Sequence, residues 1–143
     1  LPSGGANGIA LVKGRLYWTP ITGRGLYSMA TDSLSDFTLS EITLEKAVRY
    51  EGDRPACDGL AEDADGNIYF SAYEQMALVK RSPDGIFKTL VNSPLLGWPD
   101  GMFYTQNGYL YVTLGQWNRL PGFNNGKDLR KPPFLVSRMK IEK

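Results

Sequence analysis

Asparagine or aspartate stands before glycine and two apolar residues at three positions, and these side chains carry the strongest candidate chemistry. They are Asn7, Asp58 and Asp100. Carboxylate and amide oxygens are suitable ligands for Ca²⁺, which takes about six to eight of them. The competing interpretation is structural, because Asn and Asp before a turn also satisfy nearby backbone N–H groups. The pattern therefore predicts either a Ca²⁺ or polar-ligand site, or a set of capped turns.

Three further side chains are candidates for binding an organic ligand. Glu74 follows an apolar, strand-like run, where its carboxylate could position an amine or a hydroxyl group. Trp117 and Asn118 lie in a polar segment, residues 115–131, that is too long to be only a connection. Such loops often form binding lids, and an indole beside an amide could stack on a planar ligand. A solvated loop is the competing interpretation for each.

The absence of histidine removes most common catalytic arrangements. Ser-His-Asp and Cys-His catalysis and histidine-ligated metals are excluded, and no base is present to activate the many Ser and Thr hydroxyls. Cys57 is the single cysteine, so no internal disulfide forms, and we expect a small buried apolar residue there. Binding is favoured over catalysis.

Charge and hydropathy exclude two classes of partner. The net charge is +1 and the basic residues form no cluster, so a nucleic-acid surface is not expected. No run of apolar residues approaches the length of a membrane-spanning helix. The expected ligand is a small molecule.

The candidate residues are positioned by a repeat. Each of the three begins a short apolar run, and each run is followed by Gly-x-Leu/Ile-Tyr-apolar-Ser/Thr, at 14–19, 66–71 and 108–113. The runs have strand composition, and the glycines supply the positive φ angles of hairpin turns. We therefore predict three β-hairpins, with Asn7, Asp58 and Asp100 at the front of the innermost strands.

Further strands complete each unit into a propeller blade. Third strands are predicted at 25–30, 77–82 and 134–141, and fourth strands at 47–50 and 86–91. The units recur every 40 to 50 residues or so, as four-stranded blades do. We predict an all-β propeller of three blades, spanning approximately 1–52, 53–95 and 96–143. A polar insertion at 31–45, with about one helical turn, lengthens the first; the third has no evident fourth strand.

Three blades form an incomplete ring. Propellers close with about four to eight blades, and an open arc exposes apolar sheet faces. Either a further segment or a second copy of the chain must cover those faces. The expected assembly is a homodimer that closes a six-bladed ring around a two-fold axis.

Several segments resemble the royal jelly and yellow proteins and their bacterial relatives. They are ANGIAL at 6–11, LYWTP at 16–20, DRPACDGL at 53–60, WPDGM at 98–102, NRLP at 118–121 and PPF at 132–134. The resemblance implies the C-terminal half of a six-bladed propeller, in a secreted or periplasmic location. Family members include biogenic-amine binders, proteins linked to melanin chemistry, and nutrient or assembly proteins.

The sequence departs from the family at one point. Leu114-Gly115-Gln116-Trp117 stands where the family usually has Ser-Asn. A neighbouring group, the calcium-dependent gluconolactonases, shares the Asn-Gly and Asp-Gly strand starts. The alternative function is therefore a lactonase-like hydrolase in which Ca²⁺ polarises a lactone carbonyl and Asp58 or Asp100 is ligand or base.

Overall fold

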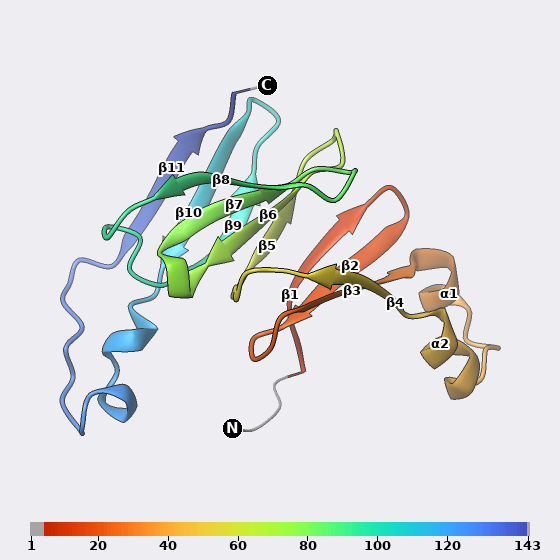
Figure 1. The fold of residues 1–143 in the computed structure, drawn as a ribbon, viewed down its shortest axis with the longest axis horizontal. Helices are drawn as coiled ribbons and strands as arrows, with labels where there is room; N and C mark the ends of the chain where they lie inside the picture. The colour runs from red at the N-terminus through yellow and green to blue at the C-terminus, as the bar shows by residue number, and fades with distance from the viewer. Residues whose placement is uncertain (1–4, 143) are drawn as a thin grey trace.

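Three antiparallel sheets follow one another along the chain in the computed structural model, which describes residues 5–142 (Figure 1). The first blade contains β1 (Ala6–Val12), β2 (Arg15–Pro20), β3 (Gly25–Ala30) and β4 (Arg49–Asp53) in that order. The middle blade contains β5 (Leu60–Glu62), β6 (Ile68–Ala72), β7 (Ala77–Arg81) and β8 (Phe87–Asn92). The third blade contains β9 (Pro99–Tyr104), β10 (Tyr109–Leu114) and β11 (Leu135–Lys140). The predicted architecture is confirmed, and within the described residues the third blade has three strands.

Glycine turns close the first hairpin of each blade as the sequence predicts. Gly14, Gly66 and Gly108 all have positive φ angles, between 76° and 93°. An L side chain rarely adopts that backbone conformation, so glycine fits these turns. The resulting register places Ile9 opposite Trp18, Leu60 opposite Phe70 and Met102 opposite Val112, on the same face of each blade.

Two apolar layers hold the blades together. Ala10 and Leu26 of the first blade pack with Leu60 and Phe70 on the facing side of the middle blade. The opposite side of the middle blade, including Tyr69, packs against the third blade in a second cluster. The middle blade is therefore covered on both faces, which explains why every residue of β6 is buried.

The repeat glycines let the innermost strands approach closely. A Cβ atom at Gly8 would lie 2.7 Å from the carbonyl oxygen of Asp58, and one at Gly59 would collide in the same way with the carbonyl oxygen of Asp100. Side-chain atoms do not tolerate such distances from backbone. Gly8 and Gly59 therefore set the spacing between neighbouring blades.

The insertion in the first blade contains more helix than the sequence indicated. It forms α1 (Thr31–Ser35) and α2 (Glu41–Ala47), and the Ser40 side chain caps α2 by accepting from the Thr43 N–H. Because α2 continues to Ala47, the fourth strand begins at Arg49, not at the predicted Ala47. None of the helices in residues 5–142 has the length and apolar character needed to cross a membrane.

The other irregular segments are short 3₁₀ helices. They are η1 (Tyr73–Gln75) after β6, and η2 (Trp117–Arg119) and η3 (Pro121–Phe123) in the long loop of the third blade. Gln116 is buried within that loop, where its side chain donates to the carbonyl of Lys131 and accepts from the Lys131 N–H and from Arg119. One amide side chain therefore ties the two ends of the loop together.

Candidate functional site

The innermost strands bring the predicted residues Asn7, Asp58 and Asp100 to one end of the arc. The Asn7 carboxamide Nδ2 donates to Asp58 Oδ1 at 2.6 Å, across the boundary between the first and middle blades. Asp58 is only 7% exposed, whereas Asn7 is exposed. The contact shows that repeat position, not sequence distance, decides which of these groups meet.

Trp98 connects Asp58 to the third blade. Its indole N–H donates to Asp58 Oδ2 at 2.8 Å, so both oxygens of that carboxylate have a donor. The indole also stacks on Tyr73 of the middle blade, with 4.2 Å between ring centroids. Trp98 has a φ angle of 56°, a strained conformation for a bulky residue that the stack and the hydrogen bond hold in place.

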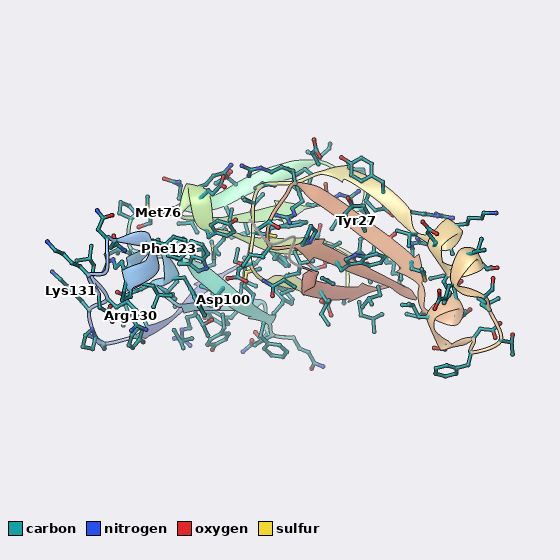
Figure 2. The ribbon with its side chains drawn as sticks, turned by 90° about the horizontal axis from the view of Figure 1, so that it is seen from below. Tyr27, Met76, Asp100, Phe123, Arg130 and Lys131 are labelled. Atoms are coloured by element: carbon teal, nitrogen blue, oxygen red, sulfur yellow. The ribbon has the colours of Figure 1, made fainter. Side chains whose placement is uncertain are left out.

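Asp100 lies in a different environment from Asp58. Its carboxyl group is half-buried, and in Figure 2 Asp100 lies between Phe123 and Tyr27, closer to Phe123. Burial raises the pKa of Asp100, and the negative charge of Asp58 raises it further, while a hydrogen bond from Trp117 acts in the opposite direction. A carboxylate in this position gains from any cation that approaches it.

Trp117 is the predicted ligand-binding residue that reaches this group. Its indole folds back over the backbone of Gly115, where a Cβ atom would lie 2.5 Å from the ring. Trp117 is 49% exposed, so the residue remains partly accessible to solvent. The site thus combines two carboxylates, an amide and a partly open aromatic surface.

Glu74 and Asn118, the other two predicted ligand-binding residues, have different contacts. The Glu74 carboxylate pairs with Arg24 at 2.7 Å, and both side chains are half exposed. The exposed Asn118 accepts through its backbone carbonyl from Asn124. An exposed ion pair contributes little stability, so Glu74 is best described as a weak link between the first two blades.

Sequence reasoning missed the role of Arg54. Its guanidinium is 3% exposed and donates to the backbone carbonyls of Pro55 and Pro20. These bonds hold the segment that enters β5, so they help to place Asp58. A buried arginine between Asp53 and Pro55 is visible only once the blades are packed. Cys57 next to it is fully buried, as predicted.

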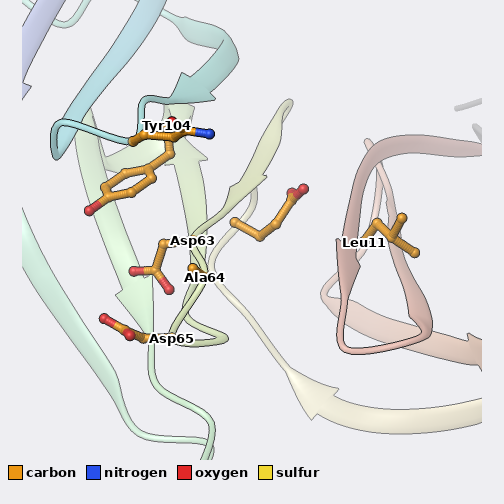
Figure 3. A pocket seen from close by; sticks show the side chains of 7 residues that line it. Leu11, Asp63, Ala64, Asp65 and Tyr104 are labelled. Atoms are coloured by element: carbon orange, nitrogen blue, oxygen red, sulfur yellow. The ribbon is translucent and has the colours of Figure 1, made fainter.

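A hollow of about 570 Å³ lies at the other ends of the innermost strands (Figure 3). It is lined by Leu11, Glu62 and Tyr104, which share one repeat position, and by Asp63 and Asp65. Asp63 accepts from Asn67 and Tyr69, and although burial raises its pKa, these bonds lower it overall. The Asp63 carboxylate therefore serves to cap its own hairpin.

The metal assignment for Asn7, Asp58 and Asp100 stays a prediction. Among residues 5–142 no three His, Cys, Asp or Glu side chains are grouped as metal ligands would be, and the predicted set contains only two carboxylates. Both oxygens of Asp58 accept hydrogen bonds, so a Ca²⁺ ion would have to compete with Asn7 and Trp98. An organic cation needs fewer oxygens than Ca²⁺ does.

A family model for major royal jelly proteins matches residues 3–129. The chain belongs to this family. The royal jelly resemblance of the sequence is thereby confirmed. No curated protein matches the chain.

Solved structures support the same fold. The chain is similar to a gluconolactonase from Xanthomonas campestris, at 18% identity and a TM-score of 0.65, over 82% of this chain and 37% of that one. The chain is also similar to a putative gluconolactonase, at 12% identity and a TM-score of 0.68, over 97% of this chain and 46% of that one. With virginiamycin B lyase from Staphylococcus aureus the identity is 13% and the TM-score is 0.58, over 97% of this chain and 42% of that one. This royal jelly family chain therefore spans less than half the length of these propellers, and the likeness shows the fold alone.

Proposed function

We propose that this chain contributes half of a ligand-binding propeller, in which Asp100 and Trp117 take a small organic cation. One observation carries the proposal: a half-buried carboxylate lies beside a half-exposed indole, at the end of the arc where the innermost strands begin. An aromatic ring that carries a primary amine on a short alkyl chain suits this pair, because the ammonium can face Asp100 while the ring meets Trp117.

The electrostatics favour a positive ligand over a neutral one. Asp58 and the partial burial of Asp100 both make the ionised carboxylate of Asp100 costly, and a bound ammonium offsets that cost. The pH dependence of cation binding follows from the same carboxylate. Because the pKa of Asp100 is raised, the carboxylate loses its charge at a higher pH than an ordinary Asp does. Cation binding should therefore weaken as pH falls through that raised pKa.

Calorimetric titration with dopamine, and with its analogue bearing a hydroxyl group in place of the amine, tests this proposal. We expect dopamine to bind at least about tenfold more tightly, and Asp100→Asn to remove most of that difference. Asp84→Asn is the matched control, since Asp84 is an exposed turn residue held by Ser82. Equal affinity for the two compounds, or an equal loss in both variants, would contradict the proposal.

A second candidate is a Ca²⁺-dependent, lactonase-like hydrolase. The grouping of Asn7, Asp58 and Asp100 at one end of the arc favours it, because these oxygens could contribute to a metal site on the ring axis. In that case added Ca²⁺ should raise the melting temperature of chelator-treated protein and support lactone hydrolysis. If Ca²⁺ changes neither, this second function is to be abandoned.

A further inference from the structure

A small cavity of about 130 Å³ lies between the first and middle blades, at the opposite end of β1 from Asn7. The turns of the β1–β2, β5–β6 and β7–β8 hairpins lie near one another in Figure 1, and they contribute Lys13, Gly66 and Pro83 to its lining. Both walls of the cavity come from residues 12–83, so no further blade is needed to form it.

The charged residues that line this cavity are all basic. Lys13, Arg15 and Arg81 lie around it, and its lining contains neither Asp nor Glu. Three cations around one small space repel one another unless an anion lies between them. The cavity is smaller than the 300–1,000 Å³ or so of pockets that enclose a drug-sized molecule, so it suits one small charged group.

The guanidinium of Arg81 is nearly buried but incompletely paired. Its side chain is 12% exposed, and its Nε makes no hydrogen bond with any residue in 5–142. The carboxylate of Glu51 in the first blade lies 3.8 Å away, which is longer than a hydrogen bond. Asp84 is exposed, and its pKa is lowered first by a hydrogen bond from Ser82 and only last by the charge of Arg81. A buried cation held this loosely is costly unless a further anion approaches it.

Arg15 is connected to Arg81 through a short chain of hydrogen bonds in the first blade. Its Nε and one Nη donate to Ser28 Oγ at 3.2 and 2.8 Å, and Ser28, which is fully buried, donates to Glu51 Oε1 at 2.5 Å. The other oxygen of Glu51 is the one that lies near Arg81. One carboxylate therefore serves two guanidinium groups, and the network keeps an excess of positive charge beside the cavity.

Lys13 adopts a backbone conformation that is rare for a lysine. Its φ angle is 46° at the first position of a two-residue hairpin turn, where Asn, Asp or Gly is usual. Its ammonium lies beside Gly66 of the middle blade, where a Cβ atom would be 3.3 Å from Lys13 Nζ. Backbone strain of this kind is concentrated at functional sites. Here it brings a third positive charge across the boundary between the blades.

We propose that this cavity binds a phosphate group, with Lys13, Arg15 and Arg81 as its cationic ligands. Guanidinium N–H groups match phosphate oxygens in geometry and form strong, charge-assisted hydrogen bonds with them. A phosphate monoester carries about −1.5 to −2 charge at pH 7, which offsets three cations better than a singly charged anion does. The bound group would bridge the first and middle blades. The proposal does not depend on the cation proposed for Asp100, which lies elsewhere on the arc.

Isothermal titration calorimetry with inorganic phosphate, in chloride at constant ionic strength, tests this phosphate site. We expect one phosphate per chain, and Arg15→Gln should raise Kd at least about tenfold, although Ser28 still donates to Glu51. Lys13→Asn should raise Kd by roughly threefold or more without loss of folding, because Asn tolerates the left-handed conformation. Lys46→Gln removes the same charge from an exposed position on α2 and should leave Kd unchanged.

The outcomes that overturn the proposal are distinct. Phosphate binding no stronger than that of chloride would do so, as would an equal loss of affinity in Arg15→Gln and Lys46→Gln, since net charge alone would then be responsible. Lys13→Asn keeps the test decisive if Arg15→Gln disturbs folding. A competition titration with glycerol phosphate identifies the source of the group. Competition means that the site takes a phosphate on a larger molecule, and exclusion of glycerol phosphate means that it takes the free ion.

Discussion

The middle and third blades share one repeat but differ in what covers them. In the middle blade Asp58, Gly59 and Ser71 are enclosed by neighbours on both sides, whereas the equivalent Asp100, Gly101 and Thr113 border open space on one side. The sequence of each unit thus specifies the hairpin, and the adjacent blade specifies the burial. The chemistry of an equivalent carboxylate therefore depends on its blade's place in the arc.

The largest effect on the free energy of unfolding is expected from substituting Gly59, in contrast to the equivalent Gly101. Gly59→Ala forces a side chain onto the carbonyl of Asp100 and should lower the free energy of unfolding by about 3 kcal/mol or more. Gly101→Ala should change it by less than about 1 kcal/mol at protein concentrations where the chain is not associated. Urea denaturation measures both. Similar losses in the two variants would show that the third blade is already enclosed in solution.

A smaller difference in the free energy of unfolding is expected for the hydroxyl groups that bond to the two glycines. Buried Ser71 Oγ accepts from the Gly59 N–H at 2.7 Å and donates to the Gly59 carbonyl at 3.2 Å. Ser71→Ala should therefore cost about 1–3 kcal/mol, because it leaves the part-buried Gly59 N–H without its partner. Exposed Thr113 makes one bond of 3.3 Å to Gly101, so Thr113→Val should stay within about 0.5 kcal/mol. The midpoints of urea denaturation measure both changes in the free energy of unfolding, when its dependence on urea concentration is the same in the variants and the unmodified protein.

The most subtle contrast is electrostatic. NMR titration should show the pKa of Asp100 above that of an ordinary Asp, and Asp58→Asn should lower it by removing the neighbouring charge. The pKa of Asp84, which Ser82 lowers, is the internal control and should not respond. An unchanged Asp100 pKa in Asp58→Asn would mean that burial alone is responsible.

The sign of the linked stability change follows from that shift. A carboxyl group with a higher pKa in the folded chain binds more protons there than in the unfolded chain, between the two pKa values. Its contribution to the free energy of unfolding therefore falls as pH rises through that interval, and stays low above it. Asp100→Asn should remove this pH dependence of the free energy of unfolding across the same interval.

The hairpins were predictable because their turn glycines and apolar runs are local signals. The predicted third strand at 25–30 coincides with β3, and the grouping of Asn7 with Asp58 follows from repeat position alone. The pairing of Glu74 with Arg24 was not predictable, because it joins exposed groups 50 positions apart across a blade boundary. The orientation of Trp98 depends on Tyr73 in another blade, which no local pattern encodes.

The close approach at Gly8 and Gly59 has a consequence for how this scaffold can vary. The spacing between blades is set by the backbone of one residue, while the residue immediately before it carries a side chain that can meet its counterpart in the neighbouring blade. Architecture and chemistry are thus assigned to adjacent but separate positions. A library that randomises positions 7 and 100 while retaining the glycines and Asp58 would vary the exposed and half-buried groups and keep the bond that holds Trp98.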